Sequence, residues 1–490
     1  MCDSSFPYNN VLNNDFYRKG KTETMGMVHK YMFLTLQHVL KSVDQKVNVI
    51  GIVLETGFPK PTAGTDCCSI LKIIDATNHD IGMTVNVFAK DTESLPLVAA
   101  VGDVIQLYRV VVKEHNGEVN AVFNKRFSSF ALYKGKDGDD LDPYQVSSKF
   151  QPRVEDKMLV NKLRKWRVNF QLHEDSSKFP MFREIKEETY INLACKILHC
   201  SEAAKDEWFI FAWDGTDTQP NAICSNLEDE LNHPLPLQLE PLPLPREILC
   251  TFPAVGSILR ITLEACVGKN HLYLLSVGKW VKIMNMRLEV HAGLWHGVFT
   301  RFTKVRYTPN EDQLVAERQR LSSERLSLKS ARMPYCSFPE PSLITAVNCP
   351  NHVTPVTLMS VLTHSEVTAK FKCVVRVVAA MPCQAEILRS PAGIYRMRLT
   401  LEDSTARIHA CVFAEDGETL FDGYPGVEKL RRKLERLLGV ECDGSNDGVK
   451  DTPRNPPWIC VCLKSYYAVK ADVWGSRNFR IFDTKIMGDT

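Results

Sequence analysis

The stretch that decides the fold lies between residues 47 and 132. Four apolar runs make it up: VNVIGIV at 47–53, CSILKIID at 68–75, MTVNVFA at 83–89 and DVIQLYRVVV at 103–112. Apolar and polar residues alternate along much of these runs, which is typical of strands with one buried face. The stretch therefore predicts a small, mainly β domain.

The turns predict how these strands connect. Asn116-Gly117 is a strong hairpin signal, after which 119–132 returns as a fifth strand. We expect a short helix over 93–100, between the third and fourth strands. Five short strands with a helix in that place is the order of the oligonucleotide-binding barrel, the OB-fold.

Two later segments repeat this plan. In the second we expect strands at 190–199, 208–213, 257–264, 272–275 and 280–290. In the third we expect strands at 369–379, 395–402, 407–413, 458–467 and 478–484. Residues 427–438 (VEKLRRKLERLL) form an amphipathic pattern that predicts a helix ending at Gly439. We expect the repetition to lie in the architecture and not in a repeated sequence motif.

The fold class predicted is mainly β, with three OB-folds in tandem joined by short helices. A connector helix is expected over 155–170 and another helix over 311–329. The predicted domains are a flexible N-terminus (1–26), a first barrel (27–148), a second barrel with its preceding connector (149–309), a linker (310–342) and a third barrel (343–490). At roughly 150 residues per domain, a chain of 490 residues has room for about three.

Composition narrows the class of protein. The net charge is only +2, which argues against a protein that coats nucleic acid without specificity. No run approaches the ~20 apolar residues of a membrane helix, and the polar N-terminus predicts a cytoplasmic or nuclear protein. The 16 cysteines show no disulfide framework and no Cys-x-x-Cys, so we expect buried reduced thiols, no metal and no cofactor.

Phrases in all three segments, in order along the chain, resemble one family. They are Val49-x-Gly51-x-Val53, Gly64-Thr65-Asp66-x-Cys68-Ser69, Val87-Phe88, Gly102-Asp103-x-Ile105, EDKM at 155–158, LRKW at 163–166, WDGT at 213–216, Pro457-Trp458 and IFDT at 481–484. The chain thus resembles the protection-of-telomeres proteins, which are related to the ciliate telomere end-binding protein alpha. The phrases of the first barrel look most like those of land-plant members.

This resemblance implies a nuclear protein of the telomeric chromosome region that has no catalytic activity. It would bind single-stranded, G-rich telomeric DNA, support telomere capping and maintenance, and regulate telomerase. The third barrel would bind telomere-capping proteins, telomerase or both.

The sequence departs from the animal members of the family in two places. Animal members carry an insertion with paired, zinc-binding cysteines in the C-terminal barrel, and this chain is shorter there and lacks the pairs. In the first loop, animal members place aromatic and lysine side chains on the DNA. This chain has Glu55, Thr56 and Gly57 instead, which leaves the strength of its grip on DNA open.

The first-barrel candidates follow from what an unpaired strand offers, namely flat base faces and phosphates. Phe88 shares a strand face with Asn86 and matches a family position that stacks on a base; the alternative is a core phenylalanine. Thr65 and Asp66 follow the first loop, where a carboxylate would accept hydrogen bonds from guanine N1 and N2. The alternative for Asp66 is a turn-forming residue.

Further candidates lie on the fourth and fifth strands and in the first loop. Tyr108 and Arg109 are adjacent, so only one of them faces the ligand unless a bulge intervenes, and Arg109 matches the family position. Lys60, Lys125 and Arg126 are candidate phosphate contacts, although exposed cations often only confer solubility.

The second and third segments carry weaker signals. His291, Trp295 and His296 lie in HAGLWHGVF, taken as a loop, in a region where the family's second barrel contacts the 3′ part of the strand. As metal ligands, the two histidines would lack partners. We expect the leucines of 427–438 to plug the third barrel, while its arginines and lysines are solvated.

Three other functions compete with this hypothesis. No phosphate loop, Gly-x-Ser-x-Gly, His-Glu-x-x-His or dinucleotide fingerprint is present, so an enzyme is not expected. An accessory subunit of telomerase or of a replication complex, acting through protein contacts with weak DNA binding, stays open. A general single-strand binder of the replication protein A type stays open as well, and equal affinity for telomeric and mixed-sequence strands would favour it.

Overall fold

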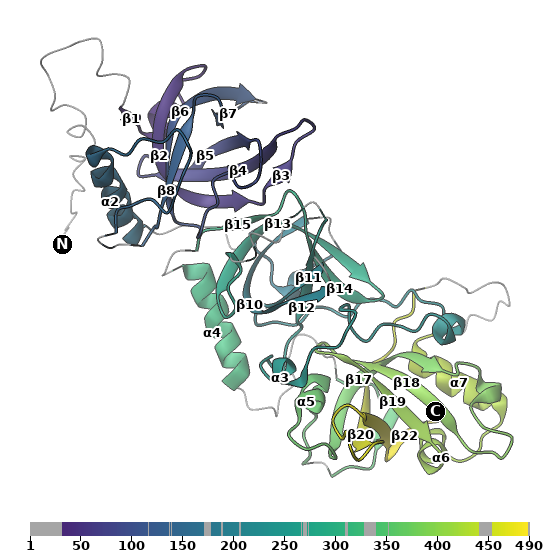
Figure 1. Cartoon of the computed structure of the whole chain (residues 1–490). Helices are drawn as coiled ribbons and strands as arrows, with labels where there is room; N and C mark the ends of the chain where they lie inside the picture. Colours follow the sequence, from purple (N-terminus) through teal and green to yellow (C-terminus); the bar gives the residue numbers. More distant parts are fainter. Residues whose placement is uncertain are drawn as a thin grey trace, which may run out of the picture.

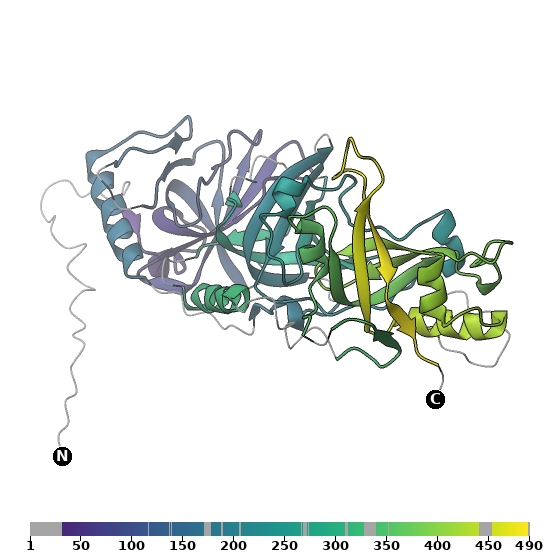
Figure 2. The same cartoon turned by 90° about the horizontal axis from the view of Figure 1, so that it is seen from below.

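The computed structural model describes residues 32–488 apart from 116, 137, 139, 171–177, 188–189, 205–206, 266, 268–271, 273, 309–311, 328–339, 351 and 441–452. The expected flexible N-terminus (1–26) lies outside this range. Three β-barrels follow one another in sequence order, from the first barrel in purple to the third in green and yellow (Figure 1). They remain in a row in the view turned by 90° (Figure 2).

The first barrel has the predicted strand order. Its strands are β2 (Lys46–Gly57), β4 (Cys67–Asp75), β5 (Asn78–Ala89), β6 (Val104–His115) and β7 (Glu118–Phe123). Antiparallel pairs join β2 to β4, β4 to β5 and β6 to β7, β5 and β7 pair in parallel, and β2 pairs with β6 to close the barrel. This is the OB-fold arrangement. Short strands β1 (Phe33–Leu34), β3 (Lys60–Pro61) and β9 (Gln145–Val146) and helix α1 (Leu36–Val39) flank it.

Two local predictions for this barrel were wrong. The stretch 93–100 forms turns rather than a helix. Pro96 disfavours a helical conformation at Leu95, and Leu95 and Val98 are instead buried in the barrel core. The expected fifth strand over 119–132 is split, because the loop 124–128 separates β7 from β8 (Ser129–Tyr133), which pairs with β6.

The second barrel closes through the same pairings. Its strands are β10 (Tyr190–Ala204), β11 (Glu207–Trp213), β12 (Leu259–Leu263), β13 (Trp280–His291) and β14 (Leu294–Phe299), with β12 and β14 in parallel. Short helical elements η3 (Phe182–Glu184), η4 (Leu227–Leu231) and α3 (Arg246–Leu249) accompany it. The strand expected over 272–275 is absent from the described residues of that stretch.

The third barrel is also closed. Its strands are β17 (Lys370–Met381), β18 (Arg396–Glu402), β19 (Arg407–Phe413), β20 (Ile459–Tyr467) and β21 (Arg477–Phe482). The elements around it are β16 (Thr345–Val347), β22 (Thr484–Ile486), α5 (Leu358–Thr363), η6 (Ala385–Ile387), α6 (Glu415–Phe421) and α7 (Val427–Leu438). Helix α7 ends at Gly439, whose φ of 64° gives the left-handed cap that glycine favours, and its leucines are buried in the barrel core as predicted.

A short motif does repeat in the three barrels, contrary to the sequence-based expectation. Each second strand leads into Asp-x-Thr, at Asp75-Ala76-Thr77, Asp214-Gly215-Thr216 and Asp403-Ser404-Thr405. One carboxylate oxygen accepts hydrogen bonds from the N–H and O–H of the threonine in every case. The other oxygen accepts the N–H of Leu36, Phe182 or Leu358, at 2.8, 2.6 and 2.7 Å respectively. Each acceptor thus ties the start of a short helix to the barrel that follows it.

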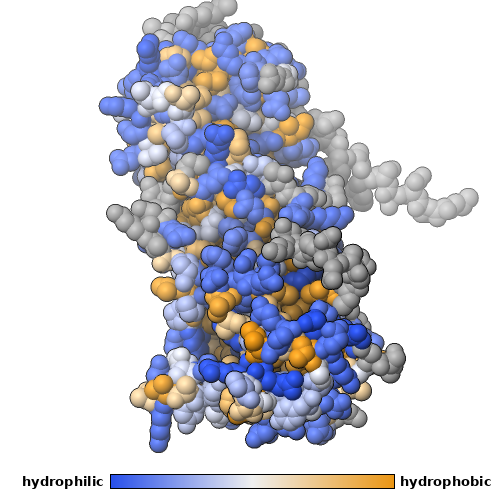
Figure 3. Space-filling view, turned by 90° about the vertical axis from the view of Figure 1, so that its right-hand side faces the viewer, coloured by the Kyte–Doolittle hydropathy of each residue, from blue (hydrophilic) through white to orange (hydrophobic). Residues whose placement is uncertain are grey.

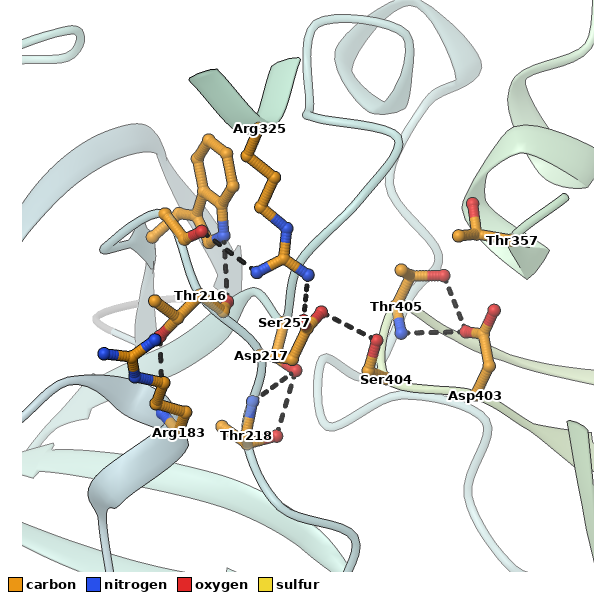
Figure 4. Close-up of polar contacts among 12 residues, drawn as sticks. Arg183, Thr216, Asp217, Thr218, Ser257, Arg325, Thr357, Asp403, Ser404 and Thr405 are labelled. Carbon is orange, nitrogen blue, oxygen red and sulfur yellow. Dashed lines mark hydrogen bonds and ion pairs between the residues drawn. The ribbon is translucent and has the colours of Figure 1, made fainter. Parts of the chain in front are cut away.

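Two aspartates of this motif are buried enough for their ionisation to change. Desolvation raises the pKa of Asp403 to about 6, and it also raises the pKa of Asp214. Figure 4 shows Asp403 with Thr405, next to the contacts that join the second and third barrels. Fixing the turn therefore also fixes residues at that junction.

Two longer helices pack against barrels. Helix α2 (Val154–Val168) is the expected connector, and its residues Val160 and Trp166 join a cluster with Ile50 and Ile52 of the first barrel. Helix α4 (Gln313–Ser327) lies in the stretch expected to be a linker, and it docks on the second barrel. Arg318 of α4 donates a hydrogen bond of 2.6 Å to the backbone oxygen of Phe179. Neither helix is an isolated spacer.

The barrels are joined by direct contacts. Strand β15 (Lys304–Arg306) pairs with β13 of the second barrel and with β2 of the first, so one sheet runs through both. Between the second and third barrels, Asp217 accepts hydrogen bonds from Ser404 and Arg325 (Figure 4). The relative positions of the barrels are therefore set by backbone pairing at one junction and by buried polar contacts at the other.

Candidate nucleic-acid interface

The side chain of Phe88 lies on the outer face of the first barrel. Along β5, Val85 and Val87 are fully buried, whereas Asn86 and Phe88 are half-buried on the opposite face. The alternation predicted from the sequence is thus present, and Phe88 is absent from the buried core of its barrel. A half-exposed ring at this place is available to stack on a base.

Phe88 lines a shallow groove with basic residues. Lys125 and Lys149 are among the other lining residues. The ammonium of Lys149 donates hydrogen bonds to the backbone oxygens of Lys125 and Arg126, which holds the loop between β7 and β8 in place. Sequence reasoning missed Lys149, which lies beyond the fifth strand.

The structure brings two candidates together at this groove. The ammonium of Lys125 lies 2.6 and 2.7 Å from the two carboxylate oxygens of Asp66. The backbone oxygen of Asp66 also accepts two hydrogen bonds from Thr62, which closes the loop that carries the exposed Thr65. Asp66 is therefore held in place by a cation that a phosphate could attract instead.

Arg109 occupies a β-bulge. The register between β2 and β6 shifts between Val47 and Val49, and Arg109 has a φ of 54°. Its N–H donates to the side-chain oxygen of Asn48 at 3.0 Å, and its exposed guanidinium lies 5.6 Å from the ring centre of Phe127. Lys46 lies 4.4 Å from the same ring. Lys46 and Phe127 extend the candidate set beyond what the sequence suggested.

Tyr108 is not available to a strand. It is buried, and its hydroxyl donates to Asp156 and accepts from Gln106 at 3.0 Å. Burial, followed by the hydrogen bond to Asp156, raises the pKa of Tyr108 well above its usual value. Its assignment as a DNA-binding residue was wrong, because the side chain packs beneath α2.

Lys60 lies at the junction of the first two barrels. Its ammonium is 5.4 Å from the ring centre of Phe302, and the guanidinium of Arg301 is 4.9 Å from that ring. Phe302 is 44% exposed. An exposed aromatic ring beside two cations has the composition of a contact for single-stranded DNA. The sequence did not reveal Phe302, because Lys60, the cation beside it, is far away in the sequence.

The three residues by which this chain differs from animal members in the expected first loop have a structural role. Glu55, Thr56 and Gly57 belong to β2 and pair with β15, so they are not in a loop. Glu55 is buried and forms ion pairs with Arg306 and, at 3.3 Å, with Lys304. This side chain joins two barrels and does not face an open groove.

The second-barrel candidates occupy a hairpin rather than a loop. Strands β13 and β14 turn at Ala292-Gly293, and His291 at the turn is exposed. The indole N–H of Trp295 donates to the backbone oxygen of Gln219 at 2.9 Å. His296 shares a 2.9 Å hydrogen bond with Thr262, and burial lowers its pKa.

This hairpin is turned toward the third barrel. A Cβ atom added at Gly293 would lie 2.8 Å from a terminal guanidinium nitrogen of Arg407. Trp295 lines a cleft between the second and third barrels together with Arg407 and Trp458. His291, Trp295 and His296 therefore do not lie in the groove around Phe88.

Among the described residues, no three His, Cys, Asp or Glu side chains converge as metal ligands would. Burial, followed by the neighbouring thiols of Cys349 and Cys460, raises the pKa of Cys462 to about 12. None of the described helices combines the length and apolar character needed to span a bilayer.

The side of the molecule to the right of Figure 1 is mostly hydrophilic, with apolar residues in small separate patches (Figure 3).

Comparison with known proteins follows the same division of the chain. Residues 28–177 match the family described as "Telomeric single stranded DNA binding POT1/CDC13", and residues 340–472 match "POT1A-like, OB fold domain". Neither description is that of an enzyme.

The relatives extend the match to nearly the whole chain. Protection of telomeres protein 1b of Arabidopsis thaliana is 39% identical over 93% of this chain and 98% of its own length. Protein 1a of the same plant is 37% identical over the same shares. The telomere-binding protein subunit alpha of Stylonychia mytilus is 22% identical over 29% of this chain and 34% of its own length. The chain therefore belongs to the protection-of-telomeres family and is similar to its land-plant members.

Proposed function

We propose that the chain binds single-stranded, G-rich telomeric DNA, with sequence preference, through its first barrel. The observation that carries this proposal is the half-exposed ring of Phe88 in a groove lined by Lys125 and Lys149. A ring beside cations matches the two features of an unpaired strand, because bases stack on the ring and phosphates pair with the ammonium groups. The family's description as telomeric single-strand binders supports the same substrate.

Sequence preference would come from Asp66. Guanine presents N–H donors at N1 and N2, and a carboxylate is a charged acceptor for them. In the absence of DNA, Lys125 neutralises this carboxylate. On binding, a phosphate would draw Lys125 away and free Asp66 for the base edge, so that charge stays balanced at each stage. Arg109, with Phe127 beside it, would hold the strand at the bulge of β6.

The family's description supports a biological role at telomeres. We infer that binding takes place at the telomeric chromosome region in the nucleus, and that it supports capping and telomere maintenance and regulates telomerase. The third barrel would dock telomere-capping proteins, telomerase or both. The chain would act by binding and not by catalysis.

A second candidate function is an accessory subunit that works mainly through protein contacts. The burial of Glu55 between two barrels favours it, because a position that grips DNA in animal members here serves the junction instead. Titration of the full chain with G-strand, C-strand and duplex DNA separates the two functions. Binding confined to the G-strand supports the first, and an absence of binding supports the second.

Replacing Phe88 with alanine should weaken binding to a G-rich telomeric oligonucleotide by about 10- to 100-fold. One lost base stack is worth roughly 1–3 kcal/mol, and the core should be unaffected because the ring lies outside it. Fluorescence anisotropy with the full chain measures the change. Tyr424→Ala removes an exposed ring from the third barrel and is the matched control, for which we expect no change. An affinity equal to that of the unmodified chain would remove Phe88 from the site.

A further inference from the structure

A row of cations crosses the outer face of the third barrel. Lys370 of β17, Lys464 of β20 and Arg480 of β21 occupy directly opposed positions on three neighbouring strands. Like charges at such positions destabilise a sheet. Asp416 forms an ion pair with Arg480 and lies 3.6 Å from Lys464, so two of these three cations share one carboxylate.

The next residues along the strands do not remove the excess of positive charge. Lys372 is two positions from Lys370 on the same face of β17, and Asp483 follows the end of β21. Lys370, Lys372, Lys464 and Arg480 thus outnumber Asp416 and Asp483, which leaves two positive charges in excess. The arrangement costs folding energy, and a bound polyanion would relieve that cost.

Aromatic rings alternate with these cations. The ring of Phe482 lies close to both Lys370 and Lys464, each of whose ammonium groups is 5.2 Å from the ring centre. Arg480 lies 5.9 Å from the ring centre of Phe413, which is 46% exposed. Tyr466, two residues beyond Lys464 on β20, is 37% exposed. We name these six residues the β20 face: Lys370, Lys464, Arg480, Phe413, Tyr466 and Phe482.

We infer that the β20 face is a second binding surface for an unpaired DNA strand. Exposed rings and lysines in alternation are what sequence-tolerant single-strand sites use, because every base has a flat face and every nucleotide a phosphate. A docking site for a protein would be expected to have fewer charges at its centre. This surface goes beyond the first-barrel site proposed above, and it predicts that a long strand is held at two places.

The test compares two charge-reversal variants of the full chain. Lys370→Glu with Lys464→Glu changes the β20 face. Arg431→Glu with Arg432→Glu makes the same change in charge on the exposed side of α7 and is the matched control. Each OB-fold covers roughly 4–16 nucleotides, so a G-rich strand of about 12 nucleotides occupies one barrel and a strand of about 45 nucleotides can reach all three.

We expect the β20-face variant to bind the long strand about tenfold more weakly and the short G-rich strand unchanged. Two lost phosphate contacts should also lower the slope of log affinity against log salt by about 1.4. The α7 variant should match the unmodified chain in both measurements. Phe413→Ala with Tyr466→Ala should weaken long-strand binding without changing the slope, because it removes rings and keeps the charges.

Three outcomes would overturn the inference. They are equal long-strand affinity for the β20-face variant and the unmodified chain, an equal loss in the α7 variant, and an equal loss of duplex binding. Thermal melting checks folding, and Lys370→Gln with Lys464→Gln replaces the charge-reversed pair if the latter melts early. The short G-rich strand tests the first-barrel site by itself, so failure of one proposal can be told from failure of the other.

Discussion

Replacing Glu402 with alanine should lower the free energy of unfolding of the third barrel by about 4 kcal/mol. The carboxylate of Glu402 pairs with two buried arginines, at 2.8 Å from a terminal nitrogen of Arg376 and 2.5 Å from Nε of Arg407. Removing one partner from a buried ion pair costs roughly 3–5 kcal/mol, because the remaining charge is desolvated and unpaired. Arginine cannot relieve this by losing its proton.

Chemical denaturation of the full chain, followed by the fluorescence of the tryptophans, measures this loss. Glu428→Ala is the matched control, because Glu428 forms only exposed ion pairs with Arg431 and Arg432, each worth at most about 1 kcal/mol. Glu402→Gln should fall between the two, since it keeps the shape and loses the charge. A loss of less than 1 kcal/mol for Glu402→Ala would show that water reaches the two arginines.

The same two arginines also join the barrels. Arg376 donates to the backbone oxygen of Asn221 at 2.9 Å, and Arg407 donates to that of Pro236 at 3.1 Å, both in the second-barrel region. Loss of Glu402 should therefore loosen the second barrel's contact with the third. Family membership and fold class do not reveal this coupling, which depends on which side chains converge.

Local patterns predicted most of the barrel strands and α7, because side-chain alternation and helical spacing depend on near neighbours. Phe88 was placed on the outer face on that basis, with Val85 and Val87 inside. The Asp-x-Thr turns were also visible in the sequence. They were missed because their middle residue varies, although all three follow a strand.

Long-range contacts were not predictable in this way. The bulge at Arg109 depends on its pairing with Asn48, and Tyr108 is buried because α2 brings Asp156 to its hydroxyl. The site around Phe88 needs Lys149, which reaches the loop from outside the five barrel strands. Each of these contacts joins segments that are far apart in the sequence. Residue type and local pattern therefore could not show which of these side chains are on the surface and which are buried.

The second large loss of stability is expected at the junction of the first two barrels. Glu55→Ala should cost about 2–3 kcal/mol and separate the melting of the first barrel from that of the second. The variant leaves Lys304 and Arg306 without their shared carboxylate where β15 pairs with β2. Both cations keep some contact with water, so the cost is smaller than for Glu402.

Differential scanning calorimetry of the full chain measures this separation, with Glu118→Ala, an exposed acid on β7, as the control. Hydrogen exchange should rise at Val305 and Thr56, whose strands pair at the junction. If the two barrels still melt together, backbone pairing alone holds them. If they separate, a DNA strand that contacts both Phe88 and Phe302 should bind more weakly, although neither ring has changed. The reason is that a rigid junction fixes the distance between two contacts in advance, and a loose junction makes the strand restore that distance at a cost in entropy.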